Sequence, residues 1–400
     1  MASRTKLLTE LSLADLWKEV KAPEQLWEDL TVEMKRTVKL LLQNRLHDEL
    51  TAHLQALRFE RVPGRRGVRN GAYRRHVTTT WGTIPDLEMP RCRLRGFVPA
   101  VVPRYQRRTA AVDRLIQAVF LAGVSTRRVG TTLAHLLGDT VSASTVSAIT
   151  RTLDHQVDAW HRRPLHDQYR YLVLDGLTLR VNTPDGTKRR LILVAYGVTR
   201  DGRRQLIDYR LAKTESQGAW EGFLITLAAR GLTGERLALI TTDGHRGLHA
   251  ALELVYPTVP RQTCWVHVLR NVAQRLRVRD RERCLALARR IYEARSRPAA
   301  ERTLHQWVRA WQPVAPTAVA CVLRDWEALL TLYQVPARDW RRVRTTNAIE
   351  RAFREVRRRT RPMTCFTNDA SCDRIIYAVM HSLNSQWQGR PLWKESTQNS

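Results

Sequence analysis

The spacing of apolar residues along the chain changes at about residue 58. In residues 1 to 57 apolar side chains recur every three or four positions, which predicts a helical N-terminal region that would also suit dimerisation. Residues 58 to 110 begin with a stretch rich in Gly and Arg, and HVTTTWGTIPDLEMP then predicts two short strands joined through Gly82. We therefore expect a basic loop and a β-hairpin, which suit either phosphate binding or a solvated linker.

Residues 111 to 160 have the spacing of a helix-turn-helix. An apolar helix is expected to end near Gly123, Ser125 to cap a second helix, and Ser144 to begin a third after the turn GDTVSAS. In a helix-turn-helix the last helix lies in the major groove of DNA. We expect a DNA-binding domain here, although packed helices without DNA contact share this pattern.

From Tyr169 the pattern becomes that of strands. YRYLVLDGLTLRV, KRRLILVAYGVT and RQLIDYRLA predict three antiparallel strands, joined by Asp-Gly turns in TPDGTK and TRDGRR. A helix, the buried strand LALITTD, a second helix and the strand PRQTCWV follow. This β-β-β-α-β-α-β order is that of a ribonuclease-H-like sheet, and the chain has no G-x-G-x-x-G or P-loop motif. Residues 165 to 268 are thus predicted to form an α/β core with a mixed five-stranded sheet.

After residue 268 the pattern is helical again. Residues 269 to 340 predict an all-helical domain. Residues 341 to 390 contain the basic segment WRRVRTTNAIERAFREVRRRTRPM, which predicts a helix capped near Thr346 or Asn347. Residues 391 to 400 are polar and are expected to form a flexible tail.

The charge of the chain points to a polyanionic partner. Lys and Arg number 67 against 38 Asp and Glu, which gives a formal net charge of +29. Arg binds phosphate through a planar fork and releases condensed counterions, so DNA is the expected partner. A ribosomal or membrane-surface protein, or a merely soluble basic one, would carry a similar charge.

The sequence gives no sign of a membrane or secreted protein. No apolar run approaches the roughly 20 residues of a membrane span, and MASRTKLLTELSLADLWKEV is unlike a signal peptide. Six cysteines without a CxxC pair argue against a disulfide framework. We expect a cytoplasmic protein.

Three acidic residues have the sequence context of a metal site. Asp175 lies inside an apolar strand and Asp243 ends the next buried one, and in a ribonuclease-H-like sheet these strands are parallel neighbours. Adjacent carboxylates repel each other unless a divalent ion bridges them, and oxygen ligands favour Mg²⁺ or Mn²⁺. Glu350 is the expected third acid and Glu355 its rival. An ordinary surface pair of Glu350 with Arg354 has the same pattern.

The octet CWVHVLRN, residues 264 to 271, allows several interpretations. His245 and His249 on a predicted helix, together with Cys264 and His267, would supply four zinc ligands. A cysteine nucleophile would need a base and an orienting partner that this spacing does not supply. We favour a third interpretation, in which His267 assists at the acidic site and Cys264 packs beside it.

The basic and polar side chains that would contact DNA fall in three regions. They are Arg65, Arg66, Arg69, Arg74 and Arg75 in the basic loop, Arg127, Arg128, Ser144 and Thr145 in the helix-turn-helix, and Arg270, Asn347, Arg351, Arg354, Arg357 and Arg358 around the acids.

Several of these motifs together resemble a known family. LDG at Asp175, TTDG at Asp243, CWVHVLRN and RTTNAIERAFREVRRRTRPM are similar to the Mutator-type transposases of bacterial insertion sequences. GVSTRRVGTTLAHLLG and RNGAYRRHVTTTWGTIPDLEMPR resemble the N-terminal region of these proteins. The similarity runs from about residue 30 to residue 390.

This resemblance implies a DDE transposase with a ribonuclease-H-like core that an all-helical insertion interrupts before Glu350. Asp175, Asp243 and Glu350 map onto the catalytic triad, which would bind two Mg²⁺ or Mn²⁺ ions, and the C-x-x-H element with His267 adjoins it. Such enzymes bind the terminal inverted repeats of their element, cut and join strands, and act as dimers or larger assemblies, on DNA of the bacterial nucleoid. A nuclease or resolvase of the same fold, or a non-catalytic helix-turn-helix regulator, remains an alternative.

Overall fold

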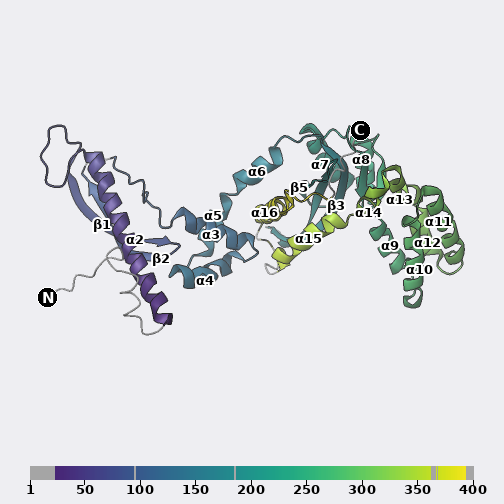
Figure 1. The fold of residues 1–400 in the computed structure, drawn as a ribbon, viewed down its shortest axis with the longest axis horizontal. Helices are drawn as coiled ribbons and strands as arrows, with labels where there is room; N and C mark the ends of the chain where they lie inside the picture. The colour runs from purple at the N-terminus through teal and green to yellow at the C-terminus, as the bar shows by residue number, and fades with distance from the viewer. Residues whose placement is uncertain (1–22, 94–95, 184–185, 362–365, 367, 393–400) are drawn as a thin grey trace, which may run out of the picture. The chain divides into compact units, whose positions relative to one another are not determined.

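The computed structural model describes most of the chain (Figure 1). The described residues are 23 to 93, 96 to 183, 186 to 361, 366 and 368 to 392. The first 22 residues of the predicted N-terminal region and most of the predicted tail lie outside them. The chain divides into two compact units, residues 1 to 151 and 152 to 400, and each is described by itself. Within the described residues, no helix is long and apolar enough to cross a membrane.

In the first unit a long helix packs on a β-hairpin. Helix α2 (Pro23–Leu54) lies against strands β1 (Arg69–Thr79) and β2 (Gly82–Cys92). The small core between them contains Leu46, Val77, Leu87, Met89 and Val102. The strands are longer than the sequence pattern predicts, because pairing of the two strands continues to Arg69 and Cys92 and therefore includes part of the Arg-rich stretch.

Three short helices complete the first unit: α3 (Ala110–Leu121), α4 (Thr126–Leu137) and α5 (Ala143–Arg151). Helix α4 packs closely on the turn before α5, since a Cβ on Gly130 would lie 2.0 Å from the Val141 carbonyl oxygen. Helix α5 begins one residue before the predicted Ser144. The Ser142 hydroxyl accepts a hydrogen bond from the Thr145 amide at 3.2 Å, so Ser142 caps the helix in place of a residue nearer to Ser144.

The second unit is built on the predicted mixed five-stranded sheet. Its strands are β3 (Tyr169–Thr183), β4 (Gly186–Thr199), β5 (Arg204–Ala212), β6 (Leu239–Thr242) and β7 (Arg261–Thr263), and their order is β5-β4-β3-β6-β7. Strands β3, β4 and β5 are antiparallel neighbours, whereas β6 runs parallel to both β3 and β7. The sequence prediction of an α/β sheet with this order is confirmed.

Helices cover both faces of the sheet (Figure 1). Helices α7 (Gln217–Ala229) and α8 (Arg246–Val255) bury one face, on which Leu172 and Leu174 of β3 join the main core. Helices α15 (Asn347–Thr360) and α16 (Asp369–Trp387) pack on strands β3, β4 and β5. Because side chains alternate along a strand, Val173 and Asp175 project away from Leu172 and Leu174.

Between β7 and α15 the chain is helical. The elements are α9 (Trp265–Gln274), α10 (Val278–Tyr292), α11 (Arg297–Trp311), α12 (Pro316–Leu323), α13 (Trp326–Leu329), the 3₁₀ helices η1 (Thr331–Gln334) and η2 (Ala337–Asp339), and α14 (Trp340–Val343). Buried hydrogen bonds attach them to the sheet: Gln262 and Trp265 both donate to the Leu329 carbonyl, and the Tyr171 hydroxyl donates to Asp339 at 2.7 Å. The helical segment is therefore fixed to the strand that carries Asp175.

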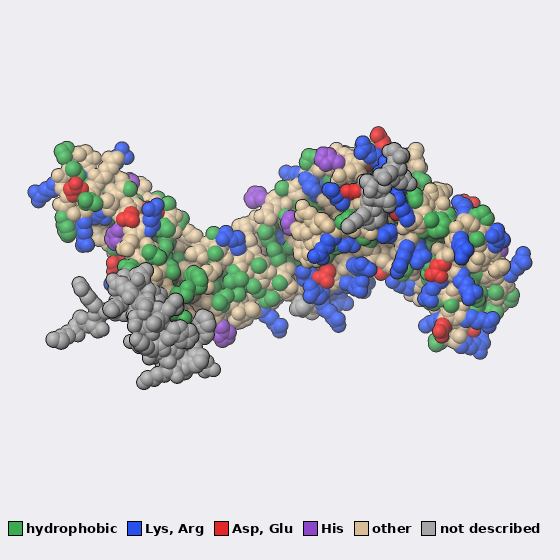
Figure 2. Space-filling view, in the orientation of Figure 1, with side chains coloured by type: hydrophobic (Ala, Val, Ile, Leu, Met, Phe, Trp, Pro, Cys, Tyr) green, Lys and Arg blue, Asp and Glu red, His purple; other side chains and the backbone are tan. Residues whose placement is uncertain are grey.

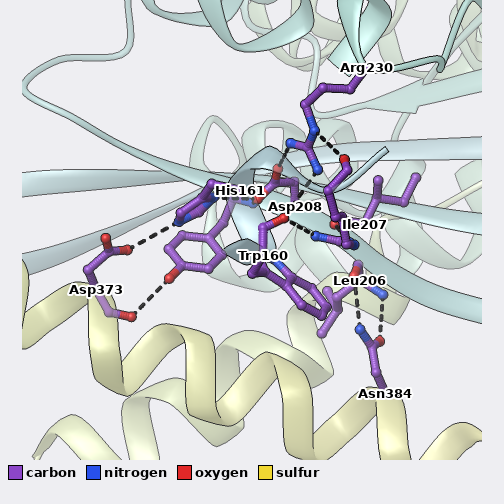
Figure 3. Close-up of polar contacts among 10 residues, drawn as sticks. Trp160, His161, Leu206, Ile207, Asp208, Arg230, Asp373 and Asn384 are labelled. Atoms are coloured by element: carbon purple, nitrogen blue, oxygen red, sulfur yellow. Dashed lines mark hydrogen bonds and ion pairs between the residues drawn. The ribbon is translucent and has the colours of Figure 1, made fainter. Parts of the chain in front are cut away.

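A buried charged network holds helix α6 (Asp154–Arg162) on strand β5 of the second unit, although most of α6 falls in the predicted segment 111 to 160. Figure 3 shows His161 between Asp208 and Asp373, with Arg230 reaching Asp208 from the other side. The His161 Nδ1 to Asp208 Oδ1 distance is 2.8 Å, and Nε2 lies 3.7 Å from Asp373 Oδ1. The two carboxylates thus share the His161 imidazole, and Asp208 also pairs with the Arg230 guanidinium.

This network predicts a pH-dependent stability. Burial lowers the pKa of His161. Hydrogen bonds to Asp208 and Asp373, together with the charges of both carboxylates, outweigh burial and raise the pKa from 6.5 to about 9. A raised folded-state pKa stabilises the fold fully below the unfolded-state value, and this contribution is lost as the pH rises through about 9. The free energy of unfolding of the wild type should therefore fall between pH 6.5 and 9, by at most about 1.4 kcal/mol per pH unit from this group.

His161→Gln keeps a polar side chain that does not titrate. The difference in free energy of unfolding between wild type and this variant, measured by denaturant titration at pH 6, 7.5 and 9, should shrink as the pH rises. A difference that is the same at all three pH values would show that folding does not raise the pKa of His161.

Candidate active site

Asp175 and Asp243 lie at the same level of two adjacent parallel strands. Val173 of β3 pairs with Thr241 of β6, and each aspartate follows two residues later. The Thr241 hydroxyl donates to the Val343 carbonyl of α14 at 2.6 Å. Because alternate residues of a strand share one face, Thr241 and Asp243 project toward the face of the sheet on which α14 lies. Asp175 is only 4% exposed and Asp243 is half-buried, and the charge of Asp243 acts on the Asp175 carboxyl group.

The electrostatics of Asp175 reflect this crowding. Burial raises its pKa to about 7, with further contributions from the charges of Asp243 and Glu350, while the Gly176 amide and the Thr346 side chain lower it. The Gly176 amide donates to Asp175 Oδ1 at 2.8 Å. A buried carboxyl group beside a second carboxylate is stabilised in its ionised form by a bound cation.

Glu350 lies in the first turn of α15, and its charge reaches Asp175. Its carboxylate pairs with Arg270 at 3.3 Å, and not with Arg354, the surface partner that the sequence also allowed. The rival acid Glu355 pairs with Arg358 and Arg359 at 2.9 and 2.6 Å. Hydrogen bonds from these arginines lower the pKa of Glu355 against the effect of burial, and its geometry is that of an ordinary helix-surface acid.

No preformed metal cage exists among the described residues, because no group of three or more His, Cys, Asp or Glu side chains has the arrangement to hold an ion. Glu350 is occupied by Arg270, while Asp175 and Asp243 lie side by side. The donor set nevertheless fits a hard divalent cation, since it consists of carboxylate oxygens held against a buried carboxyl group of raised pKa.

The zinc interpretation of the CWVH segment finds no support in the described residues. His249 is hydrogen-bonded to Thr242 at 3.0 Å, and the Cys264 sulfur accepts the Thr346 amide at 3.3 Å. These four side chains form no ligand group. Cys264 is fully buried at the N-cap of α9, directly after β7, and His267 lies in the first turn of that helix.

His267 lies within electrostatic range of Asp243. The adjacent Cys264 sulfur raises the pKa of His267, burial lowers it, and the charge of Asp243 raises it further, so the net shift is upward. The ring nitrogen Nδ1 is buried and has no hydrogen-bond partner among the described residues. A half-buried imidazole with an unused nitrogen beside Asp243 can exchange a proton or bind a phosphate oxygen.

A fourth carboxylate, Glu215, was not predicted from the sequence. A Cβ on Gly176 would lie 3.3 Å from Glu215 Oε1, so this side chain approaches the backbone beside Asp175 from the α7 side of the sheet. The Trp220 indole donates to it at 3.4 Å, and burial together with the charge of Asp243 raises its pKa. In the sequence Glu215 merely precedes the N-cap Ser216 of a helix, where an acid is commonplace, so the pattern carries no signal for it.

Six arginines line a groove of about 1010 Å³ between strands β3 and β4 and helix α15, and on α15 this lining begins one helical turn after Glu350. They include three predicted DNA-binding residues and three others: Arg354, Arg357, Arg358, Arg180, Arg189 and Arg361. Figure 2 shows Lys and Arg side chains gathered over this part of the second unit, around α15. Asn347 and Arg351 are also exposed on α15, whereas Arg270 pairs with Glu350. The groove offers several guanidinium groups to one polyanion.

The arginines predicted in the basic loop divide into two groups. Three of them are half-buried and bind the chain itself: Arg65 donates to the Gly67 and Glu60 carbonyls, Arg69 to the Thr51 hydroxyl, and Arg75 to the Pro103 and Gln106 carbonyls. Arg66 is exposed, as is Arg74, which pairs with Glu88 at 3.3 Å. The loop therefore presents fewer free guanidinium groups than its composition suggests.

The predicted helix-turn-helix residues are accessible. Arg127 and Arg128 are exposed in the first turn of α4. Ser144 is exposed and Thr145 half-buried in the first turn of α5, where both hydroxyls hydrogen-bond to Ser142.

Comparisons with known proteins show which family the chain belongs to. Residues 9 to 390 match the family described as Transposase, Mutator family. The transposase for insertion sequence element ISRM5 of Rhizobium meliloti is 33% identical, over 88% of each chain, and that for IS256 in transposon Tn4001 of Staphylococcus aureus is 32% identical, over 88% of this chain and 90% of that one. The transposase for IS406 of Burkholderia multivorans is 34% identical, again over 88% of this chain and 90% of the relative.

Among solved structures, the Drosophila P element transposase strand transfer complex aligns with 71% of this chain and 81% of its own, at 11% identity and a TM-score of 0.30, too low to bear on the fold. The sequence relatives are far more similar, and they cover nearly the whole chain. Together with the family match over residues 9 to 390, they establish that the chain belongs to the Mutator family of transposases.

Proposed function

We propose that this transposase binds the terminal inverted repeats of a bacterial insertion sequence and cuts and joins DNA strands with a DDE triad of Asp175, Asp243 and Glu350. The observation that carries the proposal is the placement of Asp175 and Asp243 at one level of adjacent parallel strands, with Glu350 reaching Asp175 from α15. Two Mg²⁺ or Mn²⁺ ions are the cofactors that suit three carboxylates. When bound, they activate the attacking water or 3′-hydroxyl and stabilise the leaving oxygen.

The protein side chains have distinct roles in this reaction. Asp175 and Asp243 hold the cations at the sheet, and Glu350 completes the set from α15 after leaving its pair with Arg270. Release of Arg270 by Glu350 frees that guanidinium to bind a DNA phosphate. His267, with an unused ring nitrogen beside Asp243, moves a proton or contacts a phosphate oxygen.

The remaining regions supply DNA binding and architecture. We assign the fold to a ribonuclease-H-like core that the helical segment from α9 to α14 interrupts as an insertion, and we assign α3 to α5 to a helix-turn-helix with α5 as recognition helix. Exposed Arg127 and Arg128 and the close approach of Gly130 to Val141 support this assignment. A second basic hollow of about 1300 Å³, lined by Arg74, Arg91, Arg104 and Arg107 among others, adds a phosphate-binding surface to the first unit. The working form is a homodimer or larger assembly in the bacterial cytoplasm.

A strand-transfer assay tests the function directly. The full chain is incubated with Mg²⁺, a labelled oligonucleotide duplex that carries the element end, and a target plasmid. Joined products that depend on Mg²⁺ and on the end sequence are expected. A scrambled end sequence serves as control.

The same assay separates the second candidate function. A nuclease or resolvase of the same sheet would cleave the labelled duplex and yield no joined product, since hydrolysis alone uses the same carboxylates. Cleavage without joining under all Mg²⁺ and Mn²⁺ concentrations would reject the transposition reaction for this chain.

A further inference from the structure

Thr346 lies where the three segments that carry the acids meet. It is 1% exposed and occupies the N-cap of α15, four residues before Glu350. Its amide donates to the Cys264 sulfur at 3.3 Å, and its hydroxyl lies 3.6 Å from the same atom. Its carbonyl accepts the Glu350 amide at 3.1 Å. The Thr346 side chain also lowers the pKa of Asp175 on strand β3.

The hydroxyl of Thr346 is used in an unusual way for its position. An N-cap threonine ordinarily accepts an amide of the first helical turn with its side-chain oxygen. Thr346 makes no such bond, and its hydroxyl lies 3.6 Å from the Cys264 sulfur instead. The contact therefore joins α15 to the sheet and contributes nothing to capping α15.

Cys264 completes the connection from the other side. Its amide donates to the Thr242 carbonyl at 2.7 Å, directly before Asp243, and the next amide, of Trp265, donates to the Arg344 carbonyl at 3.1 Å. Cys264 is fully buried, and its sulfur accepts the hydrogen bond that the Thr346 amide donates. A buried amide that lost this acceptor would be left unsatisfied, which ordinarily costs about 1 to 3 kcal/mol.

We propose that Thr346 and Cys264 are positioning residues that fix the Glu350 helix against the strands carrying Asp175 and Asp243. The inference rests on the proposed function of these three acids, and it gives the cysteine of the CWVH motif a specific task beyond packing. Neither residue needs to touch DNA for this role. Both act by holding the glutamate within reach of the aspartates.

The test is a strand-transfer assay with variants that change one hydroxyl. Thr346→Val keeps the side-chain shape and the backbone bonds but removes the hydroxyl, and it should lower kcat about 10- to 100-fold, as loss of a supporting contact in a metal site does. The KM for the DNA end should stay within about twofold. Thr346→Ser restores the hydroxyl and should return kcat to within about threefold of wild type. Thr345→Val, at the buried neighbour, is the matched control and should leave kcat unchanged.

A double-mutant cycle tests the link between the two residues. If the Thr346 hydroxyl acts through the Cys264 sulfur, Thr346→Val should have a smaller effect in a Cys264→Ala background than in the wild type. Multiplicative effects of the two substitutions would overturn the link. Wild-type kcat in Thr346→Val, or a Thr346→Ser variant as slow as the valine variant, would overturn the positioning role.

The outcome is distinguishable from failure of the proposed function. A wild type that joins strands and an Asp175→Asn variant that does not would uphold the triad, whatever Thr346→Val does. A wild type that joins no strands would remove the proposed function and this inference with it. Thermal unfolding and end binding of every variant show whether a slow variant is folded.

Discussion

Asp175→Asn is expected to abolish strand cleavage and strand joining while binding to the element end persists. The substitution preserves shape but removes the negative charge of the most buried of the three acids. Asp243→Asn and Glu350→Gln should act in the same way, since each removes one oxygen ligand from the proposed ion site. Cation-assisted charge stabilisation contributes several kcal/mol, so a rate loss of about 10³-fold or more is expected in Mg²⁺. End-labelled oligonucleotides resolved on denaturing gels measure both steps.

Glu355→Gln is the matched control for Glu350→Gln. Both acids lie on α15, but Glu355 pairs with Arg358 and Arg359. Its loss should leave the joining rate within about twofold of wild type. Normal joining by any one of the three triad variants would remove that residue from the active site. Loss of end binding together with loss of joining would point to a folding defect, which thermal unfolding detects.

The part of the fold that could be predicted from the sequence is the part fixed by local patterns. Asp-Gly turns and apolar runs indicated the three antiparallel strands, and the short buried strand before Asp243 indicated the parallel neighbour. Both aspartates followed from this order, because a carboxylate inside an apolar strand is costly to bury unless a cation or a proton neutralises it. Glu350 followed from its polar helix start, and the structure brings its charge to Asp175.

The contacts between distant segments could not be predicted. Glu215 lies 40 residues after Asp175, in the loop before α7, and only the packing of α7 on the sheet brings it beside Gly176. Thr346 has the sequence context of an ordinary N-cap, but its hydroxyl makes no capping bond and contacts the Cys264 sulfur, which lies 82 residues earlier in the chain. Such roles depend on tertiary geometry, which neither periodicity nor spacing contains.

Arginine content is likewise a poor guide to which arginines are available. In the sequence Arg65, Arg69 and Arg75 look like those of α15, but the hairpin and its loops use them to satisfy carbonyl and hydroxyl groups. A guanidinium that is bound within the fold must break those bonds before it can bind phosphate. On the outer face of α15 this cost is smaller, since Arg358 would give up only its exposed pair with Glu355, and the largest effect on DNA affinity is therefore expected there.

Replacement of Arg354, Arg357 and Arg358 together by alanine should weaken binding of the element end about 100-fold at moderate salt. Each of these exposed guanidinium groups lines the groove along α15 and can bind one phosphate. Loss of three phosphate contacts should also reduce the slope of log affinity against log salt by about 3. Because phosphate contacts carry no sequence information, scrambled DNA should lose affinity by a similar factor. Fluorescence anisotropy at several salt concentrations measures both quantities.

Arg283, Arg290 and Arg302, exposed on α10 and α11, provide a control with the same change in net charge. Their triple alanine variant should lose less than about fivefold, because long-range attraction is screened beyond about 10 Å at 0.1 M salt whereas direct contacts are not. Equal losses in the two triple variants would mean that net charge, and not the groove along α15, governs binding. A loss confined to the groove variant, with an unchanged slope in the control, would place the DNA backbone along α15 and next to Glu350.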